Sequence, residues 1–84
     1  MSSDPVTRLT FKSAPGDPVQ VQFEPVGTLF DLAGGESVAL QLPASEVSAV
    51  EIVVWPAGGV SVWVPYRGDH YVILDAEGRE LDRL

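Results

Sequence analysis

Few residues of this chain are equipped for acid–base or nucleophilic chemistry. His70 is the single histidine, and it directly follows Asp69 at the entrance of a predicted strand. A Ser-His-Asp arrangement is arithmetically possible, but the chain has no cysteine and lacks the Gly-x-Ser-x-Gly turn that presents a nucleophilic serine. We therefore interpret His70 as a half-exposed residue at a sheet edge and predict that the protein is not an enzyme. His70→Ala is expected to leave folding and partner binding nearly unchanged.

The carboxylate side chains could form two kinds of functional site, a catalytic acid–base pair or a cation site. Asp31 and Glu36, across one turn, are the closest pair for general acid–base catalysis, but acidic residues beside a hairpin turn are normally solvated. Asp69, Asp75 and Glu77 carry the oxygen ligands that a hard cation prefers, yet they lack the spacing of a calcium loop, and the last two fit a turn. One histidine without cysteine does not make a transition-metal site. We predict no bound metal and no cofactor.

Aromatic side chains are the strongest functional signal in the sequence. Two tryptophans, two tyrosines and His70 fall within seventeen residues, interleaved with two prolines. Trp and Tyr are enriched in interaction hot spots and in flat platforms that stack sugars or peptides. The alternative is that both tryptophans close the ends of a small core. The candidate binding residues are Val53, Trp55, Trp63, Tyr66 and Tyr71.

Most of these residues belong to a predicted hairpin over residues 50–64, around which the chain is organised. A three-residue loop, residues 57–59, opposes Val54 to Val62, whereas a four-residue loop opposes Val54 to Ser61. We prefer the three-residue loop because a one-residue slip mixes the two faces of the hairpin. In this register the even positions form an aliphatic face, and the odd positions carry Glu51, Val53, Trp55, Ser61 and Trp63.

The aliphatic face of this hairpin is expected to point into the core, which leaves Val53, Trp55 and Trp63 on the opposite face. Such a surface is too apolar to stay in contact with water without a partner. We predict that it binds a partner protein or a second copy of the chain, and that Trp63→Ala weakens this association by about 2–4 kcal/mol. The alternative partner is a carbohydrate or another small ligand. The four-residue loop predicts instead that Trp63 lies in the core.

Composition excludes other partner classes. The 84 residues have a net charge of −7, and the five basic residues are scattered, so we expect no binding to nucleic acid or to an anionic membrane. The sequence has neither a signal-peptide pattern nor an apolar run of transmembrane length, so the expected location is cytoplasmic. We divide the chain into a polar tail, residues 1–5, and one domain, residues 6–84.

Alternation of apolar and polar residues predicts seven or eight short strands separated by turns rich in Pro, Gly and Asp. The expected fold is all-β: a small antiparallel sandwich or a partly open barrel. Residues 7–12 and 19–23 are expected to pair as a hairpin, and residues 70–74 to lie inside a sheet. At Pro25 the inward parity changes, which predicts a bulge or a corner between sheets. Residues 43–49 are expected to hold at most one helical turn.

The predicted core follows from the inward positions of these strands. Ile52→Ala or Val62→Ala is expected to destabilise the fold by roughly 1–4 kcal/mol. The core residues are Leu9, Phe11, Val21, Phe23, Phe30, Val38, Leu40, Ile52, Val54, Val62 and Leu74.

Overall fold

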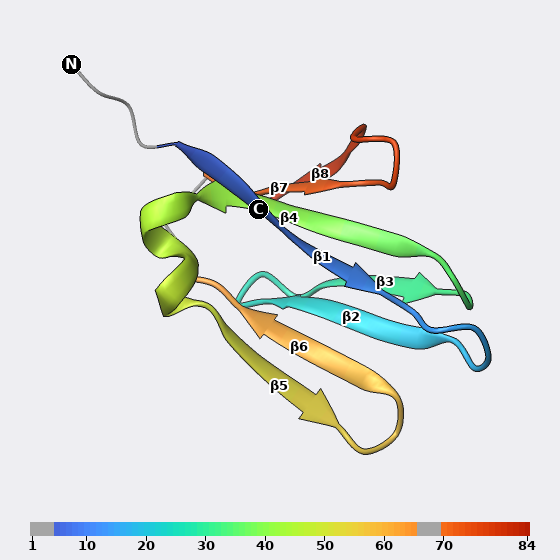
Figure 1. The fold of residues 1–84 in the computed structure, drawn as a ribbon. Helices are drawn as coiled ribbons and strands as arrows, with labels where there is room; N and C mark the ends of the chain where they lie inside the picture. Colours follow the sequence, from blue (N-terminus) through green and yellow to red (C-terminus); the bar gives the residue numbers. More distant parts are fainter. Residues whose placement is uncertain (1–4, 66–69) are drawn as a thin grey trace.

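The computed structural model describes residues 5–65 and 70–84, which form an open β-sandwich of two four-stranded sheets (Figure 1). Sheet A has the order β1-β4-β7-β8 and sheet B the order β3-β2-β6-β5. This confirms the predicted all-β fold in its sandwich form. The elements are β1 (Val6–Lys12), β2 (Val19–Glu24), β3 (Thr28–Leu32), β4 (Ser37–Pro43), the 3₁₀ helix η1 (Ala44–Ala49), β5 (Glu51–Trp55), β6 (Gly59–Trp63), β7 (Val72–Leu74) and β8 (Glu80–Arg83).

The core lies between the two sheets and is built from alternate residues of their strands. Phe23 of β2 is at its centre, fully buried, with the rings of Phe11 and Phe30 each 5.9 Å away in edge-to-face contact. The prediction is wrong for Ile52 and Val54, which are exposed. It is confirmed for eight of the other residues, which are buried in this core or packed against it: Leu9, Phe11, Val21, Phe23, Phe30, Val38, Leu40 and Val62. Leu74 is buried too, but in a separate cluster.

Strand pairing differs from the prediction at the beginning of the chain. β1 and β2 do not form a hairpin: β1 pairs antiparallel with β4, and β2 pairs antiparallel with β3 and parallel with β6. The connection between β1 and β2 instead carries the chain from sheet A to sheet B. Buried Ser13 in this connection donates its N–H to the carbonyl oxygen of Glu36 (2.9 Å) and accepts from the N–H of Gly35 (2.8 Å). The two connections β1–β2 and β3–β4 are thereby joined.

The parity change at Pro25 arises from a hairpin turn within sheet B, not from a corner between sheets. Pro25 begins the three-residue turn between β2 and β3. Because Glu24 does not pair with β3, four residues (24–27) separate the paired residues Phe23 and Thr28. This even number opposes odd-numbered residues to even-numbered ones, as in Val21 to Phe30, so the inward positions change from odd to even numbers. Val26, in the turn itself, is exposed.

The helix η1 is longer than the single turn expected, with six residues that carry the chain from β4 in sheet A to β5 in sheet B. It ends where the N–H of Val50 donates to the carbonyl oxygen of Val47 (3.1 Å). Across residues 5–65 and 70–84, no helix is long and apolar enough to span a membrane.

β7 lies inside sheet A, between β4 and β8, as the apolar run at residues 70–74 predicts. All three of its residues are buried; Val72 and Leu74 pack with Ala39 in a second apolar cluster separate from the main core. The following turn is closed by a bond from the N–H of Gly78 to the carbonyl oxygen of Asp75 (3.0 Å), and the Asp75 carboxylate accepts from two further backbone N–H groups. The prediction of a turn role for Asp75 is confirmed.

Candidate binding surface on the β5–β6 hairpin

The β5–β6 hairpin has the predicted separation of faces but a different register. Its loop is residues 56–58, one residue earlier than predicted, and Gly58 takes the left-handed conformation (φ +84°) that a three-residue loop requires. Val54 therefore opposes Val60 rather than Val62. The four-residue alternative is also wrong. The partner of each β5 residue is thus shifted by two positions along β6. Because a shift of two keeps each side chain on the same face, aliphatic residues still oppose aliphatic residues.

The aliphatic face of the hairpin is covered only in part. β1, the edge strand of sheet A, lies over β2 and β6, where Phe11 and Val60 line a crevice between the sheets. β5 packs mainly against β6. Ile52 and Val54 are thus 48% and 74% exposed although they share a face with buried Val62.

The outer face of sheet B brings the predicted aromatic residues beside polar residues of β2 and β3. Trp55 and Trp63 are exposed on this face and Val53 is half-buried, as predicted for the face opposite the core. The strand registers arrange its residues in three rows across the sheet: Trp55, Gly59, Gln20 and Asp31; Val53, Ser61, Gln22 and Leu29; Glu51, Trp63 and Glu24.

Trp55 is held in place on β6. Its indole Nε1–H donates to the hydroxyl oxygen of buried Ser61 (2.8 Å). Gly59 lies directly opposite Trp55, and Cδ1 of the indole is 3.8 Å, an ordinary van der Waals distance, from the point that a Cβ on Gly59 would occupy. The pyrrole edge of the indole therefore rests over β6, and the side chain as a whole is 53% exposed.

A groove of about 630 Å³ crosses this outer face. Trp55 and Leu29 line it from β5 and β3, and Gln20 and Gln22 line it from β2 between them. The Gln20 amide donates to Oδ1 of Asp31, also a lining residue, at 3.0 Å. The groove thus combines an aromatic ring, an aliphatic side chain and several hydrogen-bonding groups, which is the composition of many ligand sites.

The two predicted tyrosines do not add to the exposed surface that the structure describes. Tyr71 is fully buried in the core, where its hydroxyl hydrogen-bonds with the Glu46 carboxylate and the Pro65 carbonyl oxygen. It links η1 to the segment after β6 and is too buried to contact a partner. Tyr66 lies outside the described residues.

The residues considered for catalysis or metal binding do not converge. His70 is exposed, and Asp69 lies outside the described residues. Asp31 accepts from Gln20, whereas Glu36 accepts from the backbone N–H of Ala33 (2.6 Å) within its own turn. No group of three His, Cys, Asp or Glu residues within 5–65 and 70–84 is arranged to hold a metal ion.

Sequence reasoning missed the contribution of β2 and β3 to this surface. Alternation along residues 19–23 places Gln20 and Gln22 on an outward face, so their exposure was predictable. Their position beside Trp55 depends on the parallel pairing of β2 with β6, which joins segments far apart in the chain. No local signal indicates this pairing.

Comparisons with protein-family models, curated proteins and solved structures found no match for this chain. Its function is therefore inferred from the geometry of its own residues.

Proposed function

We propose that the protein is a non-enzymatic assembly domain that pairs with a second copy of itself along the free edge of β5. Within the part of the chain that the structure describes, β5 pairs with another strand on one side only. Its residues after Glu51 are all apolar: Ile52, Val53, Val54 and Trp55. An unpaired, apolar edge strand presents free backbone N–H and C=O groups and is a ready template for pairing with another chain.

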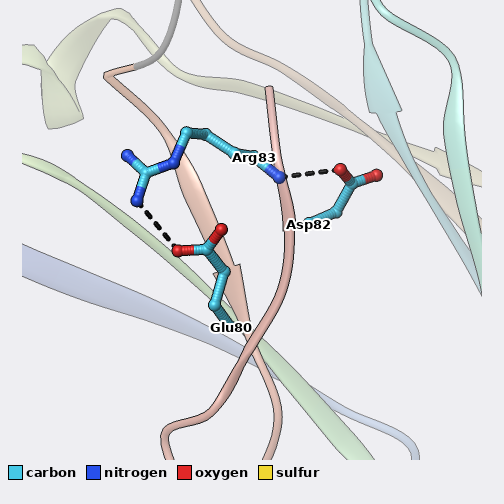
Figure 2. A network of polar contacts seen from close by, with 3 residues as sticks. All are labelled: Glu80, Asp82 and Arg83. Atoms are coloured by element: carbon cyan, nitrogen blue, oxygen red, sulfur yellow. Dashed lines mark hydrogen bonds and ion pairs between the residues drawn. The ribbon is translucent and has the colours of Figure 1, made fainter.

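The other edge strands carry charges that oppose such pairing. β1 carries Arg8 and Lys12, and β3 carries Asp31. β8 is more highly charged: Figure 2 shows Arg83 paired with Glu80 (2.8 Å), while the Asp82 carboxylate accepts from the backbone N–H of Arg83 (2.7 Å). Charged side chains on edge strands prevent edge-to-edge association. Of the four edge strands in the described part of the chain, only β5 lacks a charge beyond its first residue.

A second copy fits β5 because the strand is complementary to itself. Antiparallel pairing about a two-fold axis at Val53 opposes Ile52 to Val54 of the second copy and keeps like faces together. The two Glu51 carboxylates then lie about 14 Å apart, beyond the range of strong repulsion at physiological salt. This pairing would also cover the apolar side chains of Ile52 and Val54, which sheet A leaves exposed.

Val54→Glu tests this proposal. A carboxylate at this position would have to be desolvated against the second copy, so we expect it to raise the dissociation constant of the dimer by roughly tenfold or more. Sedimentation velocity over micromolar to millimolar protein measures the change. Val6→Glu is the matched control, because Val6 is also an exposed valine (64%) on an edge strand and the substitution changes the net charge equally.

Two outcomes would overturn the proposal. In the first, the wild-type protein remains monomeric across the whole concentration series. In the second, Val54→Glu and Val6→Glu weaken association equally, which would assign the effect to net charge rather than to the β5 edge.

A further inference from the structure

We propose that the groove on the outer face of sheet B binds a neutral saccharide, an activity separate from assembly through β5. Three properties of the groove carry this inference: the exposed ring of Trp55, the hydrogen-bonding groups of β2 and β3, and the absence of basic residues among the lining residues that the structure describes.

Trp55 offers a ring surface rather than a hydrogen-bond donor. Its Nε1–H is already bonded to Ser61, so the indole is oriented before any ligand arrives. The electron-rich face of an indole attracts the C–H groups on the apolar face of a pyranose ring. Because the ring is fixed, stacking on it costs little conformational entropy.

The side chains beside Trp55 have the chemistry that hydroxyl groups require. The Gln20 amide donates to one oxygen of Asp31, which leaves the Gln20 amide oxygen and the second Asp31 oxygen as acceptors. The Gln22 amide donates to Glu24 (2.6 Å), which leaves the Gln22 amide oxygen. Sugar hydroxyls both donate and accept, so planar amides and carboxylates held in fixed positions can bind several of them at once.

Charge favours an uncharged ligand. Among residues 5–65 and 70–84, none that lines the groove is basic; Asp31 contributes a negative charge, and the whole chain carries −7. These charges repel phosphates and uronic acids. A basic peptide would find one carboxylate, already engaged by Gln20, beside the apolar side chain of Leu29. The volume of about 630 Å³ is ample for a short oligosaccharide.

The test is an NMR titration of the full chain that follows both indole N–H signals and the backbone amide signals of the groove residues, which remain measurable in variants that lack a tryptophan. The probes are cellohexaose, xylohexaose and mannohexaose, with hexagalacturonate as the charged counterpart. We expect at least one neutral hexasaccharide to shift the Trp55 signal saturably, and hexagalacturonate to leave it unchanged. Trp55→Ala and Gln20→Ala are each expected to weaken binding by roughly tenfold or more.

Trp63→Ala is the matched control, since Trp63 is an exposed tryptophan on the same face but does not line the groove. Its affinity for the hexasaccharide should equal that of the wild type. The inference is overturned if no neutral hexasaccharide shifts Trp55 at millimolar concentration, if Trp63→Ala weakens binding as much as Trp55→Ala, or if only a lysine-rich peptide binds. Val54 does not line the groove. The variant Val54→Glu should therefore lose dimerisation and keep its affinity for the hexasaccharide, so that failure of one proposal can be distinguished from failure of the other.

Discussion

Ile52 and Val62 show how burial of a single residue depends on what lies above its strand. The two residues oppose each other directly and share one face of sheet B. Val62 is fully buried, whereas Ile52 is 48% exposed because β5 extends beyond sheet A. Hydrophobic stabilisation is proportional to the apolar area removed from water, so the two side chains contribute unequally to the fold.

This difference predicts unequal effects of truncation. Val62→Ala should lower the free energy of unfolding by roughly 1–4 kcal/mol, whereas Ile52→Ala should lower it by less than about 1 kcal/mol while the protein is monomeric. Urea unfolding at low protein concentration measures both. Equal losses for the two variants would contradict the placement of β5 beyond the cover of sheet A.

Trp63 distinguishes pairing along the β5 edge from a broader contact over the aromatic face. It lies on β6, one strand in from the edge, between Glu51 and Glu24. A partner that covers the whole face predicts a loss of about 2–4 kcal/mol in association for Trp63→Ala. Pairing limited to the edge predicts a loss below about 1 kcal/mol, because a residue outside the contact contributes little. Sedimentation velocity measures the dimer dissociation constants of Trp63→Ala and Val54→Glu, and their comparison distinguishes whole-face contact from edge pairing.

At the scale of elements, close contact between two connections holds the sheets in place. A Cβ on Gly34, between β3 and β4, would lie 2.9 Å from the backbone nitrogen of Gly16 and 3.1 Å from its carbonyl oxygen, in the β1–β2 connection. Backbone atoms cannot move aside as a flexible side chain does. The approach therefore requires glycine at position 34.

Gly34→Ala should accordingly separate the two connections and destabilise the fold by about 1–3 kcal/mol. Thermal unfolding measures the loss, with Ala33→Ser, at an exposed neighbouring position, as the control. An unchanged melting temperature for Gly34→Ala would show that the connections can separate without affecting the sandwich.

At the scale of the whole molecule, the two proposed activities use different parts of sheet B and can act together. Two-fold pairing of β5 joins both copies in one continuous sheet and places both grooves on the same outer face. The two β2 strands are then separated by five strand spacings, about 24 Å. A long saccharide could reach both grooves at once.

We therefore expect Val54→Glu to leave the affinity for a hexasaccharide unchanged but to reduce the apparent affinity for the corresponding soluble polymer by roughly tenfold or more. Binding of both probes to wild type and variant, measured calorimetrically, provides the comparison. If the variant binds the polymer as tightly as the wild type does, the two grooves of a dimer do not bind one polysaccharide simultaneously.

The sequence alone determined the strands and their faces, because these depend on neighbours close in the chain. Alternation in β1, β2 and β4 identified the buried side of each strand, and Gly58 and Asp75 marked turns through their local conformational preferences. The separation of Val53, Trp55 and Trp63 from the core followed from the same period of two.

Only the tertiary structure decided which strands pair and which faces are covered. Alternation specifies that a residue faces one side of a sheet, but not whether another sheet lies there, so Ile52 is exposed and Val62 is buried on one face. The parallel pairing of β2 with β6 creates the groove from residues almost forty positions apart, beyond the reach of any local pattern. The burial of Tyr71 also depends on tertiary structure. Its hydroxyl can be buried because it hydrogen-bonds with Glu46 and Pro65, which lie in segments that only the fold brings together.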